Sequence, residues 1–147
     1  MKAVVQRVKF AKLSVDGKIV SEIQKGMLVL LGVKVTDTEK DSEYFADKLS
    51  KLRIFEDENG KMNLSAKDVG GEVLLVSNFT LYGNLKGTNR PDFILAAKPE
   101  QAEKLYLELV NQLKKEINVA TGVFRTHMEI EMVADGPGTY IYEELAK

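Results

Sequence analysis

Residues 72–80 read Glu-Val-Leu-Leu-Val-Ser-Asn-Phe-Thr, and this stretch decides how the rest of the chain is arranged. Positions 73–76 are all apolar, so a strand formed here would have to be covered on both of its faces. That pattern is typical of the central strand of a sheet. At Ser77 the apolar run ends, and hydroxyl and amide side chains follow it. Polar groups at the end of a buried strand are a common location for a functional site.

The segments before this strand predict an antiparallel sheet and one helix. Apolar and β-branched residues indicate strands at residues 3–9, 13–15, 18–23 and 27–33. The second and third of these are joined by Asp16-Gly17, a strong hairpin signal because both turn positions take positive φ. Thr38 can cap a helix over residues 38–52, in which apolar side chains recur every three or four positions. A short hairpin is expected at residues 54–64.

The segments after it predict a second helix and the remaining strands. The helix begins at Pro99 and has one apolar face. Residues 123–134 alternate between apolar and polar, which predicts a strand with His127 on its solvent-facing side. A tight turn at residues 135–138 and a short strand at residues 139–142 follow. Together the elements predict an α+β fold: a curved or closed, barrel-like, mostly antiparallel β-sheet with two main helices, in a single domain over residues 1–147.

Composition excludes several classes of protein. The chain has 147 residues, of which 44% are apolar, which suits one globular domain. It has no cysteine and one histidine, so thiolate chemistry and the common zinc sites are excluded, and we expect no metal or cofactor. The net charge of -1 argues against broad coverage by nucleic acid but allows a small, local RNA contact. Without a signal peptide or a long apolar run, we expect a cytoplasmic protein with no membrane contact.

Several positions are candidates for chemistry, and each has a plainer explanation. The first candidate is the strand end at Ser77, Asn78, Phe79 and Thr80. It places polar side chains and free N–H groups together, which suits a site, but the same groups can simply complete the hydrogen bonds at the end of the strand. Lys86 and Arg90 flank a glycine-bearing loop that can bind a phosphate, but a solvated turn gives the same pattern. Arg7 interrupts the apolar positions of the first strand. Its guanidinium lies at the rim of the sheet or is held by carbonyl or carboxylate oxygens, because unpaired burial is costly.

Four segments, in this order and spacing, are similar to those of one known family. They are MKAVVQRV at residues 1–8, SNFTLYGNLKGTNRPDF at residues 77–93, AAKP at residues 96–99 and ADGPGT at residues 134–139. Across essentially the whole chain, the sequence resembles the D-aminoacyl-tRNA deacylase family, which includes the D-tyrosyl-tRNA deacylases. No single segment is specific alone, but their combination is.

This resemblance implies a homodimer whose active site is shared between the subunits. In the family, the dipeptide that matches Gly136-Pro137 is cis and inserts into the partner's pocket, and the arginine that matches Arg7 holds it in orientation. The two carbonyl oxygens of the dipeptide leave no space for an L side chain, so a D residue or glycine is accepted. The strand end from Ser77 to Thr80 lines the same pocket.

The implied reaction is hydrolysis of the ester between a D-amino acid, or glycine, and the terminal ribose of tRNA. The resemblance implies that the neighbouring ribose 2′-hydroxyl takes part, so the protein has to position the ester and stabilise an oxyanion with N–H groups near Phe79 and Thr80. Lys86 and Arg90 are the expected phosphate contacts at the acceptor end. Two alternatives stay open. One is a non-catalytic module that binds the RNA acceptor end, and the other is a small-ester hydrolase with Thr80 as nucleophile, for which no base is visible nearby.

The chain departs from the family pattern at three places. Asn78 stands where glutamine is usual, and its shorter amide has a shorter reach. Ala134 and Gly138 flank Gly136-Pro137 where asparagine and a larger residue are usual, which predicts a looser turn. Arg125-Thr126 replaces a small glycine-alanine pair, which alters the local pocket wall or turns an arginine toward phosphate or solvent.

Overall fold

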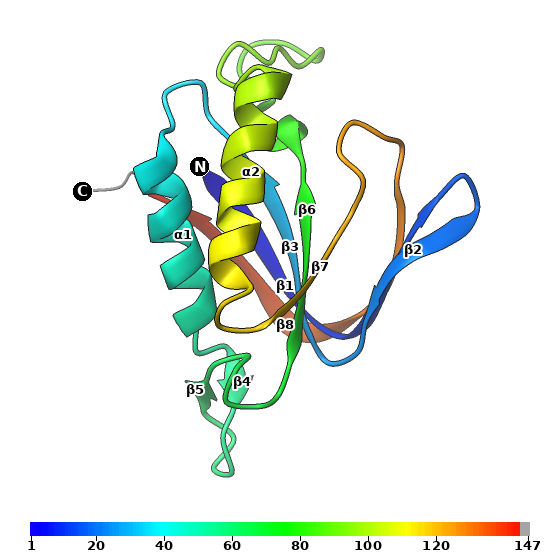
Figure 1. The fold of residues 1–147 in the computed structure, drawn as a ribbon, viewed down its shortest axis with the longest axis vertical. Coiled ribbons are helices and arrows are strands. Elements are labelled where there is room, and N and C mark those ends of the chain that lie inside the picture. Colours follow the sequence, from blue (N-terminus) through cyan, green and yellow to red (C-terminus); the bar gives the residue numbers. More distant parts are fainter. Residues whose placement is uncertain (145–147) are drawn as a thin grey trace.

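A six-stranded sheet with two helices on one of its faces forms most of the molecule (Figure 1). The computed structural model describes residues 1–144. Within that range the elements are β1 (Lys2–Val15), β2 (Lys18–Ile23), β3 (Gly26–Gly32), α1 (Glu39–Lys51), β4 (Phe55–Glu56), β5 (Met62–Leu64), β6 (Glu72–Ser77), the 3-10 helix η1 (Phe79–Tyr82), α2 (Pro99–Leu113), β7 (Asn118–Thr121) and β8 (Glu129–Glu143). Strands β4 and β5 form a small separate sheet. Neither α-helix of this range is long and apolar enough to cross a membrane.

Strand β1 organises the sheet because it pairs with three other strands. It is antiparallel to β8 along nearly its whole length, to β3 over its first half and to β2 over its second half. Near Arg7 the pairing with β8 changes register, and the buried side chains of β1 pass from one core cluster to the other. The sheet therefore curves strongly. The predicted α+β class, with a barrel-like and mostly antiparallel sheet and two helices, is confirmed.

Strand β6 lies between β3 and β7 and is parallel to both. Val73 and Leu75 pack into the core between the sheet and the helices, whereas Leu74 and Val76 pack into a second core on the opposite face. This confirms the prediction of a central strand covered on both sides. The strand delivers Ser77 to the edge of the sheet, beside the end of β3.

Helices α1 and α2 lie side by side and cover the same face of the sheet (Figure 1). Helix α1 begins after Thr38, whose backbone N–H donates to Oδ2 of Asp41 at 2.8 Å. Helix α2 begins at Pro99, as predicted. Their inward faces are fully buried at Phe45, Leu49, Leu109 and Leu113. The start of α2 is thereby fixed above the end of β6, where the candidate site lies.

The last part of the chain differs from the prediction. Residues 123–128 form a loop instead of the first half of a strand, although His127 is exposed, as expected. The sequence did not predict β7, because four residues are too few for a periodic pattern to stand out. The predicted tight turn at residues 135–138 is wrong, since β8 continues through it as a bulge within one long strand. Residues 3–9 and 13–15 likewise belong to a single strand, β1.

Candidate active site

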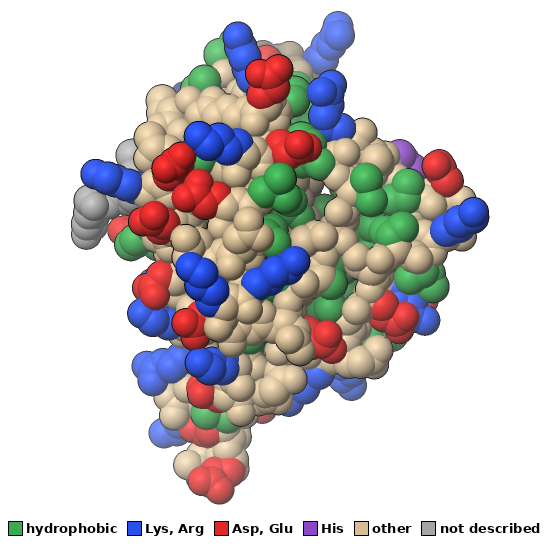
Figure 2. All heavy atoms as spheres, in the orientation of Figure 1, with side chains coloured by type: hydrophobic (Ala, Val, Ile, Leu, Met, Phe, Trp, Pro, Cys, Tyr) green, Lys and Arg blue, Asp and Glu red, His purple; other side chains and the backbone are tan. Residues whose placement is uncertain are grey.

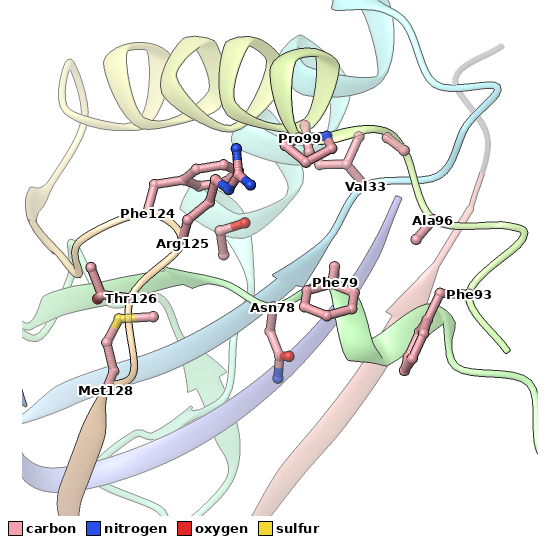
Figure 3. Close-up of a pocket in the computed structure, with 13 residues that line it drawn as sticks. Val33, Asn78, Phe79, Phe93, Ala96, Pro99, Phe124, Arg125, Thr126 and Met128 are labelled. Atoms are coloured by element: carbon pink, nitrogen blue, oxygen red, sulfur yellow. The ribbon is translucent and has the colours of Figure 1, made fainter. Parts of the chain in front are cut away.

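A cleft of about 590 Å³ opens at the end of β6, between the start of α2 and the loop at residues 122–128 (Figure 3). Most of its lining is apolar, and the polar groups come from the strand end and from the loop. The residues that line it are Val33, Ser77, Asn78, Phe79, Phe93, Ala96, Ala97, Pro99, Ala102, Phe124, Arg125, Thr126 and Met128. A ligand with apolar or aromatic parts and a few hydrogen-bonding groups suits such a cleft.

The backbone that follows β6 presents N–H groups without partners. The N–H of Asn78 donates to the carbonyl of Leu31 at 2.8 Å, which extends the ladder with β3 by one residue. The chain then turns into η1, whose first N–H groups have no preceding carbonyl in the helix. Those of Phe79 and Thr80 find no acceptor among residues 1–144. Two adjacent donors of this kind can stabilise an oxyanion.

The side chains of Asn78 and Thr80 bind each other. The Thr80 hydroxyl donates to Oδ1 of Asn78 at 2.5 Å. The contact orients the Asn78 amide and leaves its Nδ2 group as a donor. The amide oxygen accepts this hydrogen bond but is too weak a base to remove the proton, as a histidine or carboxylate could. This contact therefore provides no general base for Thr80. Thr80 also lies outside the lining of the cleft.

Phe79 and Phe93 form one wall of the cleft. Their ring centroids lie 5.0 Å apart and the ring planes are inclined by 66°. Figure 3 shows both rings on the opposite side of the cleft from Phe124 and Arg125. Phe79 is 55% exposed, which is a large fraction for an aromatic residue. An exposed ring at a cleft offers a surface on which a base can stack.

The glycine-proline segment forms a bulge in β8 and does not belong to the lining of the cleft. Strands β1 and β8 pair on both sides of Arg7, but residues 135–138 stand against Arg7 alone. The Gly136-Pro137 peptide bond is cis, as the family resemblance implies, and both residues are exposed. The bulge therefore presents its backbone to the outside of the molecule.

Arg7 is buried and holds the base of this bulge. Its Nε donates to the carbonyl oxygen of Asp135 at 3.2 Å and lies 3.3 Å from Oδ2 of the same residue. Its Nη1 donates to the carbonyl oxygen of Ile54 at 2.8 Å. Of the two predicted environments, the guanidinium thus has the one in which carbonyl and carboxylate oxygens hold it.

Gly138 closes the bulge with no room for a side chain. A Cβ atom at this position would lie 2.6 Å from the carbonyl oxygen of Asp135 and 2.9 Å from Cβ of Arg7. The side chain of Gln6 donates to the Gly138 carbonyl at 3.2 Å. The backbone at Gly138 therefore has no space for the larger residue that is usual in the family, because neighbouring atoms already occupy it.

Comparisons with known proteins relate this arrangement to one family. The family described as D-Tyr-tRNA(Tyr) deacylase matches residues 4–143. The chain belongs to this family. Curated D-aminoacyl-tRNA deacylases from Desulfatibacillum aliphaticivorans and Caldicellulosiruptor bescii are 56% and 51% identical to it over 144 residues. Each match covers 97% of this chain, with 99% and 97% of the respective relatives.

Two solved structures are also similar to this deacylase family member. One, described as the c-Myc DNA Unwinding Element Binding Protein, has 44% sequence identity and a TM-score of 0.93, and the match covers 99% of this chain and 100% of that one. The other, a probable eukaryotic D-amino acid tRNA deacylase, has a TM-score of 0.83 at 16% identity, covering 96% and 97%. At that identity the second match shows the fold alone.

The expected site residues of this deacylase family member lie in three separate places. Ser77, Asn78 and Phe79 line the cleft. Neither Arg7 nor the Gly136-Pro137 dipeptide belongs to that lining. Lys86 and Arg90 are exposed on the loop that precedes Phe93. Within one chain, the residues expected for catalysis and for chiral selection are therefore not brought together.

Sequence reasoning identified part of the cleft lining and missed the rest. Arg125 and Thr126 do form part of the pocket wall, as the departure from the family pattern indicated. Phe124 and Met128 were assigned to a strand and not to the site. Phe93 falls inside the block that resembles the deacylase family, so that block carried the signal that could have placed it in the site.

Proposed function

We propose that this chain is a D-aminoacyl-tRNA deacylase, which hydrolyses the ester between a D-amino acid, or glycine, and the terminal ribose of tRNA. The observation that carries the proposal is its similarity to D-aminoacyl-tRNA deacylases over 97% of its length. The cleft supports it, because an apolar space with aromatic rings lies next to backbone donors. The products are the free amino acid and tRNA.

The proposed chemistry needs few side chains. Attack on the ester carbonyl creates an oxyanion, and the N–H groups of Phe79 and Thr80 are the donors that would stabilise it. The described residues of the cleft lining include no histidine, aspartate or glutamate to act as a general base. We therefore assign to the neighbouring ribose 2′-hydroxyl the task of orienting the attacking water, as part of the bound substrate.

Chirality is proposed to be read by the bulge of a second copy of the chain. The tip at Gly136-Pro137 is exposed, and Arg7 fixes its base. In a homodimer in which each bulge enters the partner's cleft, the carbonyl oxygens of the dipeptide would occupy the space that an L side chain needs. A D side chain points the other way, and glycine has none, so both would be accepted. Rejection by a rigid backbone requires no selective side chain.

Lys86 and Arg90 are proposed to contact phosphates of the acceptor end. Both are exposed on a loop that leads into the Phe93 wall of the cleft. Several Lys and Arg side chains lie over this loop at the top of Figure 2, with an acidic side chain among them. Replacing both residues by alanine should weaken tRNA binding and flatten its salt dependence. Unchanged affinity and an unchanged salt slope would remove these two residues from the proposal.

The deciding experiment follows ester loss from D-tyrosyl-tRNA and L-tyrosyl-tRNA with a chelator present. Rapid loss of the D ester alone supports the deacylase. Protection of both esters would instead favour a non-catalytic module that binds the acceptor end of RNA. Loss of both esters at the same rate would contradict the proposed rejection by the bulge.

Two further changes separate the mechanisms. A D-tyrosyl-tRNA whose terminal ribose is 2′-deoxy should be hydrolysed much more slowly, and undiminished turnover would refute assistance by the 2′-hydroxyl. Thr80→Ala should keep substantial activity, because Thr80 has no base in its contact with Asn78. Abolished activity in this variant, together with cleavage of a nitrophenyl ester by the unmodified protein, would favour a small-ester hydrolase with Thr80 as nucleophile.

A further inference from the structure

Among the described residues that line the cleft, Arg125 is the one that carries a charge. It is exposed, and its guanidinium makes no hydrogen bond or ion pair with any residue of the range 1–144. Figure 3 shows it extending from the loop beside the ring of Phe124, toward the start of α2. A guanidinium stays charged at any physiological pH, so this cation is available to an anionic part of a ligand.

The backbone at Arg125 is unusual as well. Its φ of 62° lies in the left-handed region, which disfavours every residue with a Cβ atom. Within residues 1–144, the other non-glycine residue with positive φ is Asp16, in the hairpin turn between β1 and β2. Aspartate adopts this conformation several-fold more often than most residues with a Cβ atom, whereas arginine adopts it rarely. A strained residue at a cleft is a reason to look for a function of its side chain.

The chemistry of the substrate limits what this cation can bind. A D-tyrosyl or glycyl ester has no free carboxylate, and its α-amino group is neutral or positively charged. The anionic groups that tRNA brings to the cleft are therefore its phosphodiesters. A guanidinium binds two phosphate oxygens at once through parallel N–H donors.

We infer that Arg125 binds the phosphodiester that joins the last two nucleotides of tRNA, and thereby sets the direction in which the aminoacyl end enters the cleft. This inference rests on the proposed function. Asn78 and Phe79 lie across the cleft from Arg125 (Figure 3). With the phosphate at Arg125, the terminal ribose and its ester extend toward the N–H groups that follow β6. The reverse orientation would place a cationic α-amino group against the guanidinium. Arg125 is thus a positioning residue and not a catalytic one.

The test compares Arg125→Gln and Arg125→Lys on D-tyrosyl-tRNA. Arg125→Gln should raise KM about tenfold at nearly unchanged kcat, because one charge-assisted contact is lost in both the ground state and the transition state. The slope of log kcat/KM against log salt concentration should flatten by about 0.7, the value for one phosphate of a single strand. Arg125→Lys should restore that slope. Arg53→Gln is the matched control, since it removes the same charge from an exposed position beside the β4–β5 hairpin and should change neither quantity.

A short substrate separates failure of this inference from failure of the proposed function. The D-tyrosyl ester of adenosine 5′-monophosphate should be hydrolysed with a kcat/KM about tenfold above that of the adenosine ester. Arg125→Gln should abolish this difference. If D-tyrosyl-tRNA is hydrolysed but the 5′-phosphate has no effect and Arg125→Gln keeps the original salt slope, the inference is wrong and the proposed function stands. If D-tyrosyl-tRNA is not hydrolysed at all, the proposed function fails and the inference fails with it.

Discussion

Gly138 lies where a single methyl group would disturb the bulge. Its Cβ atom would meet the carbonyl oxygen of Asp135 at 2.6 Å and Cβ of Arg7 at 2.9 Å. Neither atom is the free end of a flexible side chain, so the backbone of the bulge would have to move. We expect Gly138→Ala to lower the free energy of unfolding by about 2 kcal/mol, as measured by urea denaturation. Deacylation of D-tyrosyl-tRNA should fall by roughly tenfold or more, because in the proposed homodimer the displaced tip would no longer fit the cleft of the second chain.

Gly136→Ala is the matched control for this change. A methyl group there meets open space, since the nearest atom is the backbone nitrogen of Gly138 at 4.0 Å. Its free energy of unfolding should therefore change by less than about 0.5 kcal/mol. Equal destabilisation by the two alanines would show that the packing around Gly138 is not what holds the bulge.

Arg7, Gly138 and Arg125 show what a sequence reveals about single residues. An arginine among buried strand positions must find oxygen atoms, so the chemistry of the Arg7 partners could be predicted before their identity was known. The crowding at Gly138 arises from atoms of β1, far away in the sequence, and no local pattern indicates it. The positive φ of Arg125 is set by the path of its loop between β7 and β8.

Tyr106 joins two elements, helix α2 and strand β6. Its hydroxyl donates to the carbonyl oxygen of Leu75 at 2.7 Å, and the residue is 4% exposed. Burial raises the pKa of Tyr106 from 10.0 to about 12. The folded chain thus keeps a neutral phenol that the unfolded chain ionises from about pH 10 upward. The resulting stabilisation is complete below pH 10 and is lost as the pH rises toward 12.

Tyr106→Phe should therefore have opposite effects at neutral and at high pH. At pH 7 the variant should be less stable by about 1 kcal/mol, because the hydrogen bond to β6 is lost. Between pH 10 and pH 12 the unmodified chain should lose about 2 kcal/mol more than the variant, which has no phenol to ionise at this position. Urea denaturation from pH 7 to pH 12 measures both differences in the free energy of unfolding. The other tyrosines are common to the two proteins, so their ionisation cancels in the comparison. Parallel pH profiles would contradict the coupling of Tyr106 to folding.

The elements that could be predicted are those whose pattern is complete within their own residues. A strand at residues 73–76 has apolar side chains on both faces, whatever its neighbours are. Helix α2 likewise has its apolar face within its own residues, from Pro99 onward. Strand β7 is short, and its role depends on pairing with β6. The sequence of residues 135–138 suits a turn and a bulge equally well, and the continuous pairing of β8 with β1 decides between them.

At the scale of the whole molecule, the cleft and the bulge of one chain are separate: the bulge at residues 135–138 does not belong to the lining of the cleft. The strand that carries the bulge also exposes apolar side chains on both sides of it. Met132, Val133 and Ile141 are 42%, 41% and 74% exposed. In the proposed homodimer, a second copy related by a twofold axis would cover this surface and form two equivalent sites, each with a cleft from one chain and a bulge from the other.

Two variants that are inactive for different reasons should then restore activity when they form mixed dimers. One chain carries Asn78→Ala and Phe79→Ala in the cleft, and the other carries Gly136→Phe, whose ring would fill the partner's cleft. Refolding an equal mixture makes about half of the dimers mixed, and each of these has one intact cleft facing one intact bulge. About a quarter of the original sites should therefore hydrolyse D-tyrosyl-tRNA. Mixing the cleft variant with a chain that carries all three changes should restore nothing, because no intact cleft is present. If the first mixture recovers no activity although sedimentation shows that dimers form, the whole active site lies within one chain.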